Sequence, residues 1–418
     1  MGFLALHRNV RIRIGVLFVQ RLMDTMIATF IAIYLASRVG VVATGALVLL
    51  LAAAAMVAML VGGHLSDGWG RRPVLITGEF AACGFLVLMT VANFAGWGPL
   101  AVFFSYALVK FSTSIAMPAN DSMIVDVTTP ENRKFVFTVN YWAVNLALAG
   151  GAMLGGFLYG THFGLLIAVA AVGMGGALLV TVLFVSETKP ETATGEPPAK
   201  RSGFGQFVDG YRLVLVDRTF GRLLIAATLG MTLELQMSNY IGVRLADDLP
   251  VQRLFPFGDV DGVRMLGLLK AENTVLVVIM ALFMHVLLRR MSDRMRLYAG
   301  IAMFAGGFAV LAVGHSAWVL LLACLVLTIG ELMNVPVKQS LLAELAPEQG
   351  RPRYMAAYNL NIRIAQALAA GFISLGAIVS PWGISALYVL MGVVIIIQYR
   401  AILARRGTRA EAENPAAA

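Results

Sequence analysis

The amino-acid sequence predicts an all-α membrane protein of twelve transmembrane helices, arranged as two pseudo-symmetric bundles of six. An apolar composition, regularly spaced apolar runs and an internal repeat predict this fold. Of the 418 residues, 59% are hydrophobic and only 13% are charged, whereas a soluble protein carries about a quarter charged residues. Runs long enough to cross a hydrocarbon core of ~30 Å recur along nearly the whole chain. This pattern excludes a soluble domain of ordinary size.

The predicted helices follow these apolar runs. We expect them at about 10–37, 41–64, 73–93, 98–127, 135–159, 163–186, 219–246, 267–290, 295–314, 317–345, 353–378 and 382–404. The first run is too long for the core of a signal peptide, so we interpret it as a retained first span. Cys83 and Cys324 both lie inside apolar runs and are interpreted as small hydrophobic residues, not as a disulfide pair.

Basic residues predict the orientation of these helices. The net charge is +9, but the Lys and Arg residues form short clusters between the apolar runs, which is the topology pattern of membrane proteins and needs no nucleic-acid partner. The clusters on the richer side include Arg8, Arg11, Arg13, Arg71, Arg72, Arg133, Lys134, Lys200, Arg201, Arg289, Arg290, Arg351 and Arg405. The positive-inside rule therefore places both termini in the cytoplasm.

A polar segment divides the chain into two halves. We expect a first six-helix bundle at 1–186, a cytoplasmic linker at 187–218, a second six-helix bundle at 219–404 and a cytoplasmic tail at 405–418. The linker begins as a polar, Pro-containing stretch. Its second part has apolar residues at helical spacing and predicts a short amphipathic helix at the inner membrane surface.

The two halves share sequence patterns in the same order. Pro118 precedes Asp126 by eight positions, and Pro336 precedes Glu344 by the same eight positions. A Ser-Asp pair ahead of basic residues also occurs at 66–67 and again at 292–293. Internal repeats of this kind are typical of transporters whose substrate site lies between two related halves.

Residues 63–73 form the most specific short motif, with Gly63, Asp67, Gly70, Arg71 and Arg72 at defined spacing. Glycines permit a tight turn and a close helix approach, and a carboxylate can face a helix N-terminus or a basic side chain. A plain cytoplasmic turn would need the arginines but not the Gly-Asp-Gly spacing. The segment resembles the signature loop of the major facilitator superfamily, which implies that these five residues form a conformational latch at the cytoplasmic face.

A closer resemblance covers residues 126–146, residues 10–18 and the Gly330-Glu331 pair. These segments are similar to lactococcal-type multidrug/proton antiporters, which implies export of amphipathic, often cationic compounds in exchange for protons across a bacterial plasma membrane. The chain departs from that group at three positions. Asn140 stands where the group has a carboxylate, and the second carboxylate of the group, near Ser238, is also absent. Ala152 replaces the group's usual proline.

Five ionisable side chains fall near the middle of predicted spans, at a rise of ~1.5 Å per residue. They are Asp24, Lys110, Glu234, Glu331 and Arg363. A charge at the bilayer centre costs roughly 2.5–3.5 kcal/mol or more, so each of them is a candidate functional residue.

The three carboxylates are the candidate proton-coupling residues. Glu331 is the first choice, because it occupies the position that the resemblance implies; a static ion pair with Lys338, two turns away, is the alternative. Asp24 has Arg21 at i−3, so a local structural pair is its alternative. Glu234 lies one turn from Ser238 and could replace the carboxylate that is absent there.

We expect the remaining candidates to serve in the substrate cavity or in gating. Lys110 is expected to be a proton relay or a counter-ion for Asp24 or Glu331, close enough to Asn140 and Asn145 for hydrogen bonds. Arg363 has the same two possible roles. The substrate-cavity set is completed by Tyr34, Trp142, Tyr240 and Lys338, although such aromatic residues also pack ordinary helices. Asp126 and Arg133, at inner helix ends, join the gating set.

These features predict a monomeric, proton-coupled multidrug exporter that works by alternating access. Its expected partners are a small-molecule substrate, protons and the lipid bilayer. A lipid or glycolipid flippase and a proton-coupled peptide or nutrient transporter are alternatives on the same fold. We expect no enzyme activity, cofactor, metal site or nucleic-acid partner, since neither a nucleophile–base arrangement nor a phosphate-binding Gly-rich loop is visible.

Overall fold

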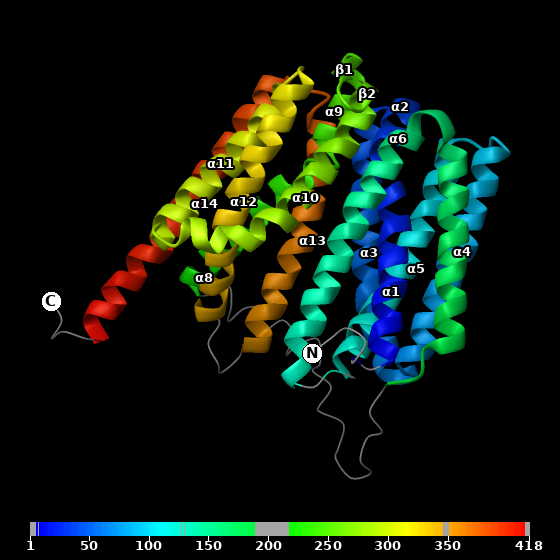
Figure 1. Cartoon of the computed structure of the whole chain (residues 1–418), viewed down its shortest axis with the longest axis horizontal. Coiled ribbons are helices and arrows are strands. Elements are labelled where there is room, and N and C mark those ends of the chain that lie inside the picture. The colour runs from blue at the N-terminus through cyan, green and yellow to red at the C-terminus, as the bar shows by residue number, and fades with distance from the viewer. Residues whose placement is uncertain are drawn as a thin grey trace, which may run out of the picture. The chain divides into compact units, whose positions relative to one another are not determined.

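The computed structural model describes residues 6, 8–126, 128, 130–188, 217–345 and 351–413. In these ranges the chain is helical apart from one hairpin of two short strands and the connecting turns (Figure 1). Most of the predicted linker, including its expected amphipathic helix, lies outside the described residues.

The chain divides into two compact units. Unit 1 comprises Met1–Thr192 and Gly242–Val278, and unit 2 comprises Ala193–Ile241 and Ile279–Ala418. The expected boundaries at 186, 218 and 404 remain a prediction.

Unit 1 contains the helices α1 to α6, most of α9, the hairpin and the first part of α10. Their bounds are α1 Arg8–Ala28, α2 Ile31–Val39, α3 Val41–Trp69, α4 Arg71–Phe94, α5 Pro99–Asp126, α6 Pro130–Phe184, α9 Tyr240–Asp248, β1 Gln252–Leu254, β2 Gly258–Val260 and α10 Gly262–Leu288. The two strands are antiparallel. Helix α1 packs along α6, while α5 packs against both α3 and α4. A core that includes Met26, Phe103 and Leu166 is buried among these helices.

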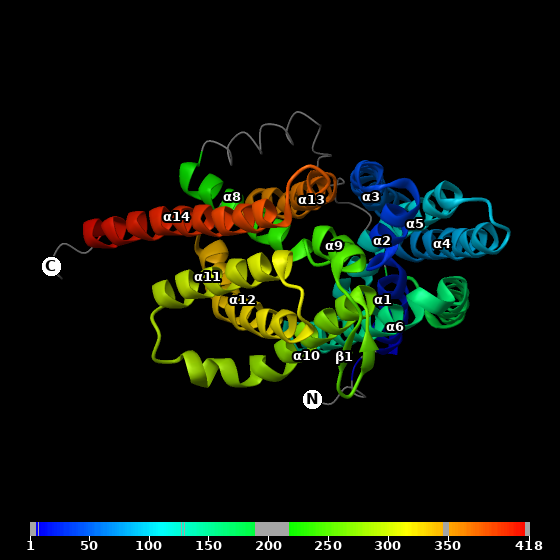
Figure 2. The ribbon, with the colours of Figure 1, turned by 90° about the horizontal axis from the view of Figure 1, so that it is seen from above.

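Unit 2 contains α8 Arg218–Leu235, the end of α10, α11 Asp293–Val313, α12 Ala317–Leu345, α13 Arg351–Leu375 and α14 Pro381–Glu413. Helix α11 packs against α12 and α14, which lie beside it in Figure 2. Helix α8 packs against α13 and α14. The N-terminus of α8 is capped by Asp217, whose carboxylate accepts hydrogen bonds from the backbone N–H groups of Thr219 and Phe220.

Five predicted helices differ from the observed ones in detail. The first is divided by a turn at residues 29–30 into α1 and α2, and the seventh by a turn at residues 236–239 into α8 and α9. The fifth and sixth are the two halves of α6, which bends at the non-helical His162. The eighth begins at Gly262, five residues before the predicted start.

Nine segments of the described chain are long and apolar enough to cross a membrane. They are Arg8–Val39, Val41–Ser66, Arg71–Phe94, Pro99–Ile124, Phe135–Gly160, His162–Phe184, Asp293–Val313, Ala317–Leu342 and Pro381–Ala404. The helices α8–α9, α10 and α13 occupy the three other predicted positions. The predicted fold class, an all-α protein of twelve membrane helices, is confirmed.

Glycines in the first half of α6 allow this helix to approach α1 closely. A Cβ atom placed on Gly151 would lie 2.6 Å from the carbonyl oxygen of Leu22, and one on Gly155 would lie 2.5 Å from a ring carbon of Phe30. Small residues at such contacts let helix backbones meet, which is how helices associate in a membrane.

We expect Gly155→Ala to destabilise the protein, because the buried ring of Phe30 leaves no space for the new methyl group. Overpacking of this kind costs about 1–3 kcal/mol. Gly176→Ala is the matched control in the same helix, since a Cβ there meets open space and alanine favours a helix by up to about 1 kcal/mol over glycine. Thermal unfolding of the purified chain measures both. If both variants change the unfolding temperature by the same amount, α1 and α6 do not meet at Gly155.

Candidate functional site

An ion pair joins α1 to α5 inside unit 1. The ammonium group of Lys110 donates to both carboxylate oxygens of Asp24, at 2.7 and 2.9 Å. Both side chains are about one quarter exposed, and the ammonium also lies 5.7 Å from the ring centre of Tyr106. Of the alternatives left open for Lys110, the structure forms the counter-ion pair with Asp24.

Two expected contacts around this pair are not formed in the part of the chain that the structure describes. The hydrogen bonds of Asp24 go to Lys110 rather than to Arg21, which instead interacts electrostatically with Asp121. The sequence predicts hydrogen bonds from Lys110 to Asn140 and Asn145, but its ammonium group donates to Asp24 instead. The physical reason is helix packing: both asparagines are on α6, which packs chiefly on α1 and α4, whereas Lys110 is on α5.

A second, deeper ion pair was not predicted. Arg13 of α1 donates to Glu79 of α4 at 3.3 Å and to Thr181 of α6 at 3.3 Å, and it also donates to Asn120 of α5. Arg13 is 1% exposed and Glu79 is 4% exposed. The charge pattern predicts that Arg13 belongs to the cytoplasmic face, but α1 begins at Arg8 and places Arg13 inside the helix bundle.

Unit 2 brings the other two candidate proton-coupling carboxylates together. Glu234 of α8 and Glu331 of α12 interact electrostatically with each other and with Lys338 of α12. Tyr358 of α13 interacts with Glu234 as well. Glu234 is exposed, and Glu331 and Lys338 are half-buried, so a ligand can reach all three. These three side chains are called the acidic cluster below.

The remaining candidate of unit 2, Arg363, contacts a different group. Its guanidinium donates to Gln366 on the same helix at 3.1 Å. Lys338 interacts electrostatically with Glu331 on the same helix, as in the alternative of an ion pair between the two, but it interacts with Glu234 as well.

The aromatic candidates divide between packing and exposed positions. Tyr34 is buried and stacks on Phe163 with ring centres 4.8 Å apart. Tyr240 is also buried, against Gly376. Both therefore fit the packing alternative better than a cavity wall. Trp142 is 37% exposed, and its place in the substrate cavity stays a prediction.

The loop between α3 and α4 forms contacts with α5 and with the chain after α6. Gly70 has a φ of +105° and makes the turn between the two helices. Arg71 donates to Asp126 at 3.0 Å, and Arg72 donates to the carbonyl oxygens of Val182 and Val185. Four gating candidates thus take part in one set of contacts. The side chains of Asp67 and Arg133 lie outside the described part.

Gly63 has a different environment from the one expected. A Cβ there meets open space, whereas a Cβ on the preceding Gly62 would collide with the backbone carbonyl group of Ile115. The close approach of α3 to α5 therefore depends on Gly62. Since both glycines precede Asp67 in one apolar run, the sequence alone does not distinguish them.

Glu187, the first residue of the predicted linker, completes this set of contacts. Its two carboxylate oxygens accept hydrogen bonds from the backbone N–H groups of Arg71 at 3.2 Å and of Arg72 at 3.0 Å. Glu187 thus caps the N-terminus of α4, where an anion is favoured by the helix dipole. Thr188 donates to Asp126 at 3.2 Å and extends the same contacts.

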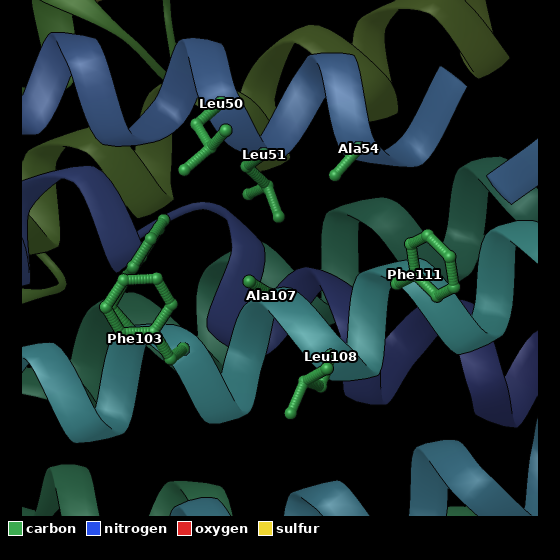
Figure 3. A pocket seen from close by; sticks show the side chains of 8 residues that line it. Leu50, Leu51, Ala54, Phe103, Ala107, Leu108 and Phe111 are labelled. Atoms are coloured by element: carbon green, nitrogen blue, oxygen red, sulfur yellow. The ribbon is translucent and has the colours of Figure 1, made fainter. Parts of the chain in front are cut away.

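An apolar groove of about 310 Å³ lies between α3 and α5 (Figure 3). It is lined by Leu50, Leu51, Ala54, Phe103, Phe104, Ala107, Leu108 and Phe111. All eight side chains are apolar, so they offer no hydrogen bond to a polar ligand.

Comparisons with known proteins give the family of the chain. A sequence model described as Major Facilitator Superfamily matches residues 14–370, with a second match over residues 265–418. A Na(+), Li(+), K(+)/H(+) antiporter of Planococcus maritimus is 27% identical over 374 residues, which are 87% of this chain and 88% of the relative. The multidrug resistance protein MdtH of Salmonella typhimurium is 24% identical over 317 residues, 73% of this chain and 70% of that protein.

The fold is also similar to solved structures. A peptide transporter of the POT family, crystallised with sulfate, superposes with a TM-score of 0.73 over 98% of this chain and 96% of its own. The identity is 18%, so this likeness concerns the fold alone.

We expect Lys110→Met to destabilise the protein by about 1–3 kcal/mol, because it leaves the half-buried carboxylate of Asp24 without its partner. The double variant Asp24→Asn/Lys110→Met removes both charges and should recover most of this loss. Thermal unfolding of the purified single and double variants measures the coupling. If the stability loss of the double variant equals the sum of the losses of Asp24→Asn and Lys110→Met, the two side chains do not form an ion pair.

We expect Glu187→Ala to lower stability by about 1 kcal/mol, as loss of a helix cap does. Glu187→Gln keeps an acceptor oxygen but loses the charge at the helix N-terminus, so its loss should be smaller. The same thermal measurement applies. If the alanine variant unfolds like the unsubstituted chain, Glu187 does not cap α4 in solution.

Proposed function

Because the chain belongs to the major facilitator superfamily and is a multi-pass secondary transporter, we propose that it exports amphipathic organic cations in exchange for protons. In this proposal the transporter stands in a bacterial plasma membrane with both termini in the cytoplasm. It works by alternating access and carries out transport rather than catalysis.

The acidic cluster carries this proposal. With Glu234 and Glu331 ionised and Lys338 protonated, the three interacting side chains sum to one negative charge. Charge in a membrane is costly unless it is compensated. One proton or one monovalent cation restores neutrality, and the binding of either removes the attraction for the other. Competition for a single negative charge is a physical basis for exchange.

Glu331 is the proposed principal proton carrier, with Glu234 as its partner in the acidic cluster. Protonation of Glu331 would release a bound cation, and deprotonation would restore the negative charge that binds the next one. Asp24 is proposed as a further proton site, because protonation of its carboxylate would weaken its attraction for Lys110.

The contacts around the α3–α4 loop are the proposed gate. The Arg71–Asp126 ion pair and the Glu187 cap hold the inner ends of α4, α5 and α6 together. Both ion-pair partners are largely shielded from solvent, at 16% and 14% exposure. Asp67 and Arg133 are proposed members of this gate.

The names of two relatives support different substrates. The multidrug resistance protein from Salmonella supports a drug-like organic compound as the substrate. The antiporter from Planococcus, with higher identity and coverage, supports exchange of a monovalent metal cation for a proton. The acidic cluster is compatible with this second candidate, since carboxylate oxygens also bind hard cations. Direct measurement of transport distinguishes the two.

We expect Glu331→Gln to abolish proton-driven accumulation of ethidium in inverted membrane vesicles, because an amide can neither release a proton nor change the charge of the cluster. Asp259→Asn, on the exposed hairpin, is a control that removes a carboxylate without touching the cluster. Normal expression of each variant must be verified. Unchanged ethidium transport by the Glu331 variant would exclude its role as proton carrier.

The same vesicles test the second candidate. Addition of Na⁺ or K⁺ should collapse an imposed pH gradient if the chain exchanges metal cations for protons. The substrate would be a metal cation rather than an organic cation under two conditions. The unsubstituted chain would have to collapse the pH gradient without transporting ethidium, and Glu331→Gln would have to lose this collapse.

A further inference from the structure

Unit 2 contains a group of methionines that the proposed function does not use. Met284, Leu288 and Met333 form a buried cluster, and the other six of its nine members pack against these three. Five of the nine members are methionines: Met280, Met284, Met291, Met303 and Met333. Methionine makes up only 21 of the 418 residues of the chain, so it is strongly enriched at this place. All five belong to unit 2.

A close contact between α11 and α12 positions two of these methionines. A Cβ on Gly300 would lie 2.7 Å from the carbonyl oxygen of Gly330 and 3.0 Å from the Cβ of Met333. A Cβ on Gly330 would lie 2.9 Å from the Cβ of Met303. The two helices therefore meet backbone to backbone, and each contributes one methionine next to this contact.

The end of α10 supplies two further methionines. Met280 and Met284 are four positions apart, so they lie on the same face of the helix. Met284 belongs to the buried cluster with Met333, and Met280 packs against this cluster. Three helices thus bring methionine side chains to one place.

The thioether sulfur distinguishes these side chains from the leucines of the same cluster, Leu288 and Leu332. Methionine fills irregular gaps in a core, but a leucine of similar volume also packs there. What methionine adds is a soft sulfur ligand, and soft thioether ligands select Cu⁺ over hard ions such as Na⁺ or Mg²⁺. A thioether is neutral, so it needs no deprotonation before it binds a metal.

The charge near these methionines favours a monovalent ion. Neutral thioethers leave the charge of a bound ion uncompensated, and an uncompensated charge in a membrane is costly. Glu331 lies two positions from Met333 on α12, which is about 3 Å along the helix axis. The net negative charge of the acidic cluster is therefore close enough to balance one positive charge, but not two.

We propose that Met280, Met284, Met303 and Met333 form a binding site for a soft monovalent metal ion, Cu⁺ or Ag⁺. Each sulfur donates one electron pair to the ion. Methionine has three rotatable bonds, so the sulfur atoms can turn toward a single ion without a cavity of ligand size. Met280 and Met303 are half-buried, which leaves the site accessible. The site goes beyond the proposed exchange of organic cations, because it binds a metal ion through sulfur.

Titration of the purified full chain with Ag⁺ tests the site. Silver nitrate in a chloride-free buffer is the probe, because Ag⁺ is as soft as Cu⁺ and is not oxidised by air. Thiols also bind silver, so every protein carries Cys83→Ala and Cys324→Ala. Isothermal titration calorimetry measures the Kd without a proton gradient, and a failure of proton coupling therefore leaves this measurement unaffected.

We expect Met333→Leu to raise the Kd for Ag⁺ by at least about tenfold, an effect that loss of an outer-shell partner alone has on metal affinity. The fourfold variant with leucine at 280, 284, 303 and 333 should lose binding. Leucine keeps an apolar side chain of similar volume, so thermal unfolding without silver should change little. Met174→Leu is the matched control, since Met174 is a buried methionine in the core of unit 1.

Two results would overturn the proposal. If the fourfold variant binds Ag⁺ as tightly as the cysteine-free parent, the four methionines hold no metal ion. If Met174→Leu weakens binding as much as Met333→Leu does, silver binds methionines throughout the chain and not at one site. Should Met333→Leu fail to fold, Met280→Leu and Met303→Leu, at half-buried positions, give the same comparison.

Discussion

The cost of placing charge inside a membrane governs how the helices of unit 1 are joined. Arg13 and Glu79 would each be unfavourable alone at near-complete burial, yet together they connect α1 to α4. Lys110 and Asp24 connect α5 to α1 in the same manner. Since removal of one partner leaves a buried charge behind, each pair stabilises one helix arrangement over others. These ion pairs therefore specify which helices are neighbours, more than they add to net stability.

Close contact between helix backbones is a second constraint in unit 1. The glycines at 151 and 155 on α6 let α1 approach α6, and Gly62 on α3 lets α5 approach α3, without side chains between them. Apolar surface provides no net attraction between helices in lipid, so packing of small residues and polar contacts carry the association. Glycine positions and ion pairs act together in unit 1.

Much of this fold can be predicted from the sequence because membrane helices are specified locally, by composition and length. The acidic cluster was partly predictable too, since Glu331 and Lys338 lie seven positions apart on one helix. Arg13 was missed because an arginine near the N-terminus looks like a topology signal; only the start of α1 at Arg8 shows that it is buried. Such errors of a few residues change the inferred depth of a charge.

Glu187 shows a different limit, and it has a consequence for biosynthesis. The N-terminus of α11 is capped by the adjacent residue Ser292, whose hydroxyl accepts a hydrogen bond from the backbone N–H of Met295. Helix α4 is capped from 116 residues farther along the chain. During synthesis, the N-terminus of α4 therefore stays without this cap until the sixth span has left the ribosome. The corresponding helix of the second half can be capped as soon as it forms. The two halves share sequence patterns, but their corresponding helices are thus capped at different stages of synthesis. One helix needs a distant residue for its cap, and the other uses an adjacent one.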